Sequence, residues 1–137
     1  MFKSLDDLLS QEVTEESWYD DGFLIAKDIM NDFTANDWEE LADNIDDKDI
    51  EWKKKLIYSV DNQLIWEELL IIGKAINTDD EELFEMCIDS LRSYDKEDIR
   101  RFLDEHKDVK SKLNDISINS SGITKSIVDS LLNKLSE

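Results

Sequence analysis

The sequence predicts an all-α fold in a single domain spanning residues 1–137. It contains no proline and only three glycines, whereas proteins built from sheets need more turn-forming residues. Apolar residues recur at spacings of three and four along almost the whole chain, which is the period of one face of a helix. A chain of 137 residues fits one hydrophobic core. We therefore expect about seven or eight helices.

Capping residues and apolar stripes place these helices along the chain. Small polar or acidic residues favour helix starts because their side chains accept hydrogen bonds from free backbone N–H groups. In the first half of the chain, helices are expected from Ser4, from Thr14 into Trp18 and Tyr19, over 21–32, from Thr34 or Asn36 to Ile45, and over 50–60. In the second half, they are expected over 64–76, from Thr78 to Leu91, from Asp95, and over 123–135. The segment 114–122 is expected to be a polar loop.

The helix at 64–76 is expected to lie at the centre of the fold. It carries apolar residues on nearly every side, including Leu64, Trp66, Leu69 and Ile72. A helix that is hydrophobic all round is buried on more than one face.

An internal repeat suggests how the helices are stacked. A shift of 31 positions takes Trp38 to Leu69 and Trp52 to Leu83, and it takes the acidic link 46–49 to 77–80. Residues 34–94 therefore read as two repeat-like helical hairpins, with C-terminal helices over 95–137. Two folds stay open: a short α-solenoid or an irregular helical bundle.

The net charge bears on the choice of partner. The 35 acidic residues outnumber the 16 basic ones, so the formal net charge is −19. Nucleic acids and anionic membranes attract basic surfaces, so direct binding to either is not expected. We expect a basic protein partner. The alternative is an acidic chain whose charge serves only solubility.

Catalytic chemistry is poorly supported by the residues. His106 is the only histidine, and Cys87 lies on an apolar stripe with Glu85 and Asp89 nearby, which disfavours a reactive thiolate. The acidic clusters lack the alternating ligands and central glycine of a calcium loop, and no glycine-rich phosphate loop occurs. We expect no enzyme activity, no metal and no cofactor. The absence of a signal peptide and of a long apolar run favours the cytoplasm.

Acidic residues and aromatic residues are the candidate partner-binding site. Equivalent turns of stacked repeats lie side by side, so the two acidic turns are expected to form one ridge. Aromatic residues among carboxylates make good interface anchors. The candidate residues are Asp46, Asp47, Asp49, Asp79, Asp80, Glu81 and Glu82 in the turns, Glu39, Glu40 and Asp43 as an extension, and the aromatic residues Tyr58, Trp18 and Tyr19.

Three runs within residues 35 to 94 share a pattern of tryptophan or leucine among charged residues: 37–41, 51–56 and 80–91. Together they resemble bacterial immunity proteins of polymorphic and contact-dependent growth-inhibition toxin systems, of the HEAT-like helical type. The resemblance implies a short HEAT-like solenoid that binds a cognate toxin domain in the cytoplasm and blocks it. Such toxins are often basic nucleases, among them tRNases. The family has no shared catalytic residues. The alternative is an acidic helical-repeat adaptor that docks a peptide or protein partner in a groove.

Overall fold

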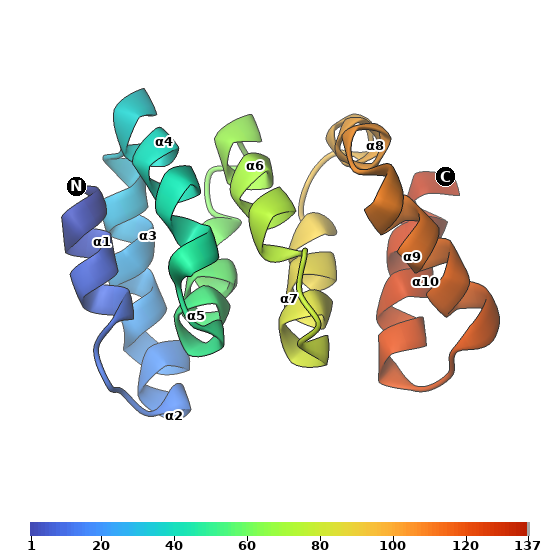
Figure 1. Ribbon diagram of the computed structural model, residues 1–137, viewed down its shortest axis with the longest axis horizontal. Coiled ribbons are helices and arrows are strands. Elements are labelled where there is room, and N and C mark those ends of the chain that lie inside the picture. Colours follow the sequence, from blue (N-terminus) through green and yellow to red (C-terminus); the bar gives the residue numbers. More distant parts are fainter. Residues whose placement is uncertain (137) are drawn as a thin grey trace.

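The computed structural model describes residues 1–136, and helices are the only regular elements in that range (Figure 1). The all-α prediction is confirmed. Within residues 1–136, nine α-helices have eight residues or more, close to the seven or eight expected. Three short pieces complete the set: α2 (Glu15–Ser17), a π-helix (Trp18–Gly22) and a 3₁₀ turn (Ile45–Asp47).

The long helices form two layers that run side by side from the N-terminus to the C-terminus (Figure 1). Neighbours within a layer contact one another, and the layers pack together over the core. The first layer contains α1 (Phe2–Leu9), α4 (Ala35–Asn44), α6 (Trp66–Ala75) and α8 (Lys96–Glu105). The second layer contains α3 (Phe23–Asn31), α5 (Ile50–Val60), α7 (Glu81–Leu91) and α10 (Ile123–Ser136), and α9 (Lys107–Asn119) packs on α8 and α10.

The internal repeat coincides with two helical pairs. The bounds of α4 and α6 differ by 31 positions at both ends, and so do those of α5 and α7. The helix α8 continues the first layer, but α9 intervenes before α10, so the third pair is not a copy of the others. Stacked pairs in which each contacts its neighbours favour the solenoid alternative over an irregular bundle.

The helix α6 is central, as predicted, because it packs against α4, α5, α7 and α8. Leu69, Ile71 and Ile72 are buried, whereas Leu70 is 47% exposed. The helix is shorter than expected: it begins at Trp66, after Leu64 with a positive φ of 57° and Ile65 in an extended conformation.

A buried carboxylate holds the loop between α5 and α6. Glu68 is fully buried. Its carboxylate accepts hydrogen bonds from the backbone N–H of Gln63 at 2.9 Å, from that of Ile65 at 3.3 Å, and from the Tyr94 hydroxyl at 2.9 Å. Burial and the charge of Glu68 raise the pKa of Tyr94, so this phenol stays a donor. One side chain therefore joins the loop, the start of α6 and the end of α7.

Replacing Leu64 by glycine is expected to stabilise the fold. A left-handed conformation costs a residue with a Cβ about 1–2 kcal/mol, and glycine adopts it freely. The Leu64 side chain is 48% exposed, so its removal loses little burial. We expect a gain of about 1 kcal/mol in the free energy of unfolding, measured by urea denaturation at an unchanged m-value. Leu64→Ala keeps the strain and is the control; equal stabilities of the two variants would contradict this explanation.

Several local expectations are wrong for identifiable reasons. Ser4 does not begin the first helix, which starts at Phe2. The segment 114–122 is mostly helical, because α9 extends to Asn119 with Leu113 buried and Ile116 packed against the core. The cap of α7 is Asp80, which accepts from the Leu83 N–H at 2.8 Å, while the Thr78 hydroxyl accepts from the Asp80 N–H.

The N-terminal ends of three other helices agree with the sequence prediction. Thr34 caps α4 in a reciprocal capping box with Asp37, and Thr14 caps α2. Asp95 occupies the N-cap position of α8 without a side-chain hydrogen bond to the helix.

None of the helices within residues 1–136 combines the length and the hydrophobicity needed to pass through a bilayer.

Candidate functional site

The two acidic turns lie side by side. Lys54 on α5 pairs with the second turn, since its Nζ is 3.1 Å from Glu82 Oε2 and 3.9 Å from Asp80 Oδ1 on the next hairpin, and it also lies 3.7 Å from Glu51 Oε1 on its own helix. Lys74 on α6 reaches back to Asp46 at 4.0 Å. Asp46, Asp47, Asp79 and Glu81 are exposed. We name this surface the acidic edge, defined by Asp46, Asp47, Asp49, Glu51, Asp79, Asp80, Glu81 and Glu82.

Two members of the acidic edge also have structural roles. Asp49 accepts from the Trp52 N–H at 2.9 Å and so caps α5, as Asp80 caps α7. These bonds satisfy N–H groups that a helix start leaves free, and the negative charges suit the helix dipole. Neutralising Asp49 or Asp80 would therefore weaken the fold as well as any binding.

The predicted anchors Tyr19 and Tyr58 meet beside the acidic edge. Their ring centroids are 4.4 Å apart, and Phe23 contacts Tyr58 edge-on at 5.2 Å. Both tyrosines are 38% exposed. Burial, followed by the charges of Glu15 and Glu82, raises the pKa of Tyr19. We name Tyr19, Phe23 and Tyr58 the tyrosine cluster; it presents aromatic surface next to carboxylates from two different segments.

Trp18 is not a surface anchor, contrary to prediction. It is 2% exposed, and Lys55 lies over its ring. The π-helix at Trp18–Gly22 is the reason, because its wider turn places the indole against Gly22, where any Cβ would overlap the ring. Ordinary helical spacing gives no sign of this bulge.

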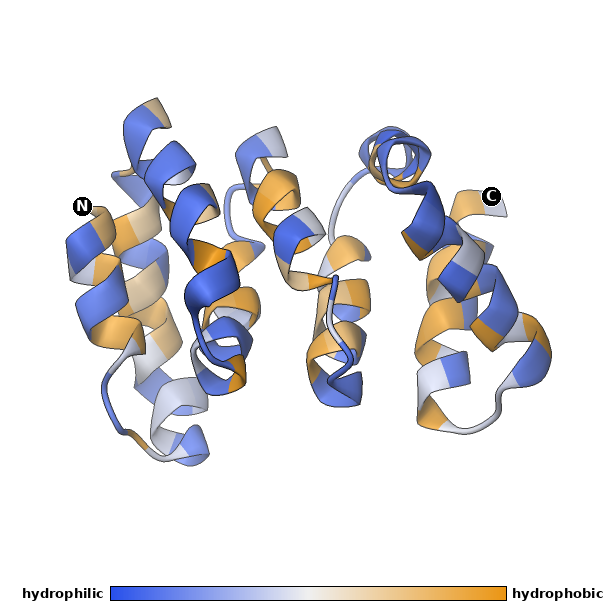
Figure 2. Ribbon diagram, viewed as in Figure 1, coloured by the Kyte–Doolittle hydropathy of each residue, from blue (hydrophilic) through white to orange (hydrophobic). Residues whose placement is uncertain are grey.

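The proposed extension of the ridge covers a different surface. Glu39, Glu40 and Asp43 are exposed on α4, which belongs to the first layer. Figure 2 shows α4 as a mostly hydrophilic helix. Tyr19 lies on the π-helix, and Phe23 and Tyr58 lie on the second-layer helices α3 and α5. The three acids of α4 therefore extend the negative surface away from the tyrosine cluster.

Glu15 belongs to the site, although the sequence analysis did not select it. It shares a small cavity with Tyr19, Glu51 and Lys54.

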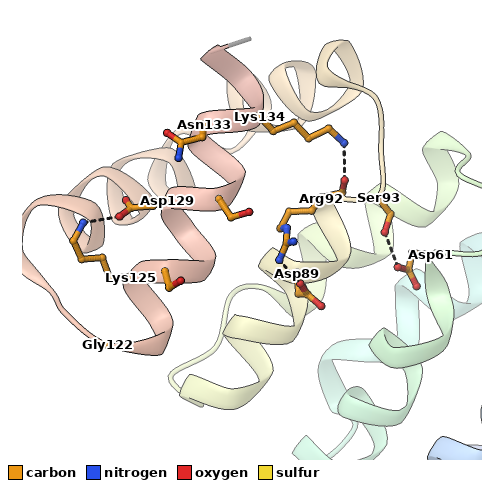
Figure 3. A pocket seen from close by; sticks show the side chains of 11 residues that line it. Asp61, Asp89, Arg92, Ser93, Gly122, Lys125, Asp129, Asn133 and Lys134 are labelled. Carbon is orange, nitrogen blue, oxygen red and sulfur yellow. Dashed lines mark hydrogen bonds and ion pairs between the residues drawn. The ribbon is translucent and has the colours of Figure 1, made fainter.

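A polar groove of about 1000 Å³ lies between the end of α7 and α10 (Figure 3). Its basic side chains have partners: Arg92 pairs with Asp89 at 2.7 Å, Lys125 pairs with Asp129 at 2.6 Å, and Lys134 donates to the Arg92 carbonyl at 2.6 Å. No local motif marks this groove, because it brings together residues roughly 40 positions apart.

His106 and Cys87 have structural surroundings. His106 Nδ1 is 2.8 Å from the Phe102 carbonyl oxygen, and its ring stacks on Phe102 beside Gly73 of α6. Cys87 is fully buried, and burial raises the pKa of its thiol to about 12. In the part of the chain that the structure describes, no three histidine, cysteine or acidic side chains gather closely enough to hold a metal ion.

Comparisons with known proteins add no relatives. No protein-family model, no curated protein and no solved structure is significantly similar to this chain.

Proposed function

We propose that this protein is an immunity protein that neutralises a basic toxin domain, a nuclease such as a tRNase, by binding it through the acidic edge and the tyrosine cluster. One observation carries the proposal: Tyr19 and Tyr58 contact each other near Glu82, so exposed aromatic rings and exposed carboxylates share one surface. Buried aromatic anchors surrounded by charged residues are typical of tight protein interfaces.

The chemistry of a nuclease explains why an acidic inhibitor would suit it. Nucleases hold phosphates with Lys and Arg, and carboxylates form charge-assisted hydrogen bonds with the same side chains. An acidic surface placed there occupies the site that the nucleic acid needs. The net charge of −19 would also steer a basic partner toward the chain, which favours fast association.

The second candidate function is an adaptor that docks a peptide or protein partner. The groove between α7 and α10 favours it, because it is large and lined by hydrogen-bonding groups. An adaptor would bind through this groove, and neutralising the acidic edge would leave its affinity nearly unchanged.

A growth assay tests the proposal directly. We expect the gene beside that of this chain to encode a basic nuclease domain that stops bacterial growth when expressed alone. Co-expression of the chain should restore growth, and the two proteins should purify as one complex. A neighbouring gene without such a product, or a folded chain that fails to rescue, would contradict the proposal.

The tyrosine cluster should control how long that complex persists. Replacing Tyr19 and Tyr58 together by alanine is expected to speed dissociation at least about tenfold, which corresponds to 1.4 kcal/mol. Leu24→Ala with Ile25→Ala is the control, since these residues are also exposed but lie outside the cluster. Surface plasmon resonance with a catalytically inactive toxin would measure both rates. Equal dissociation of the two double variants would remove the tyrosines from the interface.

A further inference from the structure

A small cavity lies between α5 and α7, next to the tyrosine cluster. Its volume is about 140 Å³, and its lining consists of Ile57, Tyr58, Asp61, Met86, Asp89 and Ser90. Asp61 and Asp89 also line the large groove, so the two spaces adjoin (Figure 3). The cavity thus combines apolar walls with two carboxylates.

Among the described residues, 1–136, the Ser90 hydroxyl has no hydrogen-bond partner. Ser90 is 5% exposed, and its Oγ is buried. Its counterpart 31 positions earlier, Ser59, donates to the Lys55 carbonyl at 2.9 Å, as serine in a helix commonly does. Because buried polar groups are nearly always paired, an unpaired hydroxyl on a residue that lines a cavity is a candidate partner for a ligand there.

Asp61 lacks a cationic partner. Within residues 1–136 it forms no ion pair within 4.0 Å, and its only side-chain donor is the Ser93 hydroxyl at 3.0 Å (Figure 3). Burial raises the pKa of Asp61 more than Ser93 and the charge of Lys27 lower it. Asp89, at the rim, already binds a guanidinium, that of Arg92, at 2.7 Å. Asp61 is partly buried, and Lys27 acts on it without forming an ion pair, so a cationic ligand that pairs with this carboxylate would be favoured here.

We propose that this cavity receives an arginine side chain of the protein partner. Its guanidinium binds Asp61 and the Ser90 hydroxyl, and its methylene groups pack against Ile57, Met86 and Tyr58. Arginine suits the site better than lysine, because its planar fork carries five N–H donors and can contact acceptors on two helices at once. The inference rests on the proposed function for the identity of the partner, but the cavity can be tested without it.

The test uses N-acetyl-arginine amide as the probe and the whole chain, followed by NMR of its methyl groups. We expect saturable shifts of the Met86 and Ile57 methyl signals. Asp61→Asn and Ser90→Ala should each weaken binding, the first about tenfold or more because it removes a charge-assisted pair. Asp104→Asn removes the same charge from an exposed position on α8, outside the proposed binding surface, and should leave the affinity unchanged. Equal affinity of Asp61→Asn and the native chain, or comparable binding of N-acetyl-lysine amide, would overturn the proposal.

Stability measurements separate lost binding from lost folding. The raised pKa of Asp61 means that the folded state disfavours its carboxylate, so a neutral Asn should leave the melting temperature at pH 7 equal or higher. With the toxin as ligand, unchanged dissociation for Asp61→Asn would refute the arginine contact while leaving the immunity function intact. Conversely, if the arginine probe binds but no basic toxin partner is found, only the immunity function is refuted.

Discussion

Replacing Glu68 by alanine is expected to destabilise the fold by about 3 kcal/mol or more. The carboxylate is fully buried and accepts from Gln63, Ile65 and Tyr94. Alanine would leave two backbone N–H groups and one phenol without this acceptor, at about 1–3 kcal/mol for each buried group left unsatisfied. The loop between α5 and α6 would lose the acceptor that holds it, while the helix contacts within each layer would remain.

Graded variants make this prediction specific. Tyr94→Phe removes a single donor and should cost about 1 kcal/mol. Glu68→Gln keeps the shape but exchanges one acceptor for a donor that faces N–H groups, so its cost should fall between the other two. Glu67→Ala, one position earlier and exposed, is the control and should cost under about 0.5 kcal/mol. Urea unfolding measures all four; a Glu68→Ala variant as stable as Glu67→Ala would show that the network contributes nothing.

The burial of Glu68 could not be predicted from the sequence. It lies within an apolar run, next to Glu67, and both acids suit a first helical turn equally well. Glu68, unlike Glu67, accepts from the N–H groups of Gln63 and Ile65, which flank Leu64 with its positive φ, and from the Tyr94 hydroxyl. The loop conformation and a tyrosine 26 positions away therefore bury Glu68, and periodicity alone does not distinguish the two acids.

The regular part of the fold was open to prediction because it is repetitive. Residues 31 positions apart occupy equivalent places, so Trp38 and Leu69, and likewise Trp52 and Leu83, are all buried. The meeting of the acidic turns follows from the same stacking. Trp18 could not be predicted, since a π-helix shifts it by one place toward the core. The groove between α7 and α10 and the cavity beside Asp61 could not be predicted either, because they form between helices and no sequence motif marks them.

The acidic edge should set the rate at which the partner arrives. Asp46→Asn, Asp47→Asn and Asp79→Asn together change the net charge from −19 to −16. All three side chains are exposed, and none of them caps a helix, so the fold should be unaffected. We expect association with the inactive toxin domain to slow about tenfold at low salt, with little change in dissociation, because rim charges act mainly on encounter. The dependence of the association rate on salt should flatten at the same time.

A second triple variant with the same net charge separates local from global electrostatics. Glu97→Gln, Asp104→Asn and Glu105→Gln change three exposed acids on α8, away from the paired turns (Figure 1). Net charge alone would make the two triple variants associate equally slowly. A local interface predicts a much larger effect for the acidic edge, because interactions between exposed charges fade beyond a Debye length of about 8 Å at physiological salt. Stopped-flow fluorescence from 50 to 500 mM salt, roughly the range over which screening grows, would resolve the two. Equal rates for the two variants would move the interface off the acidic edge, and indifference of both to salt would favour a groove-binding adaptor.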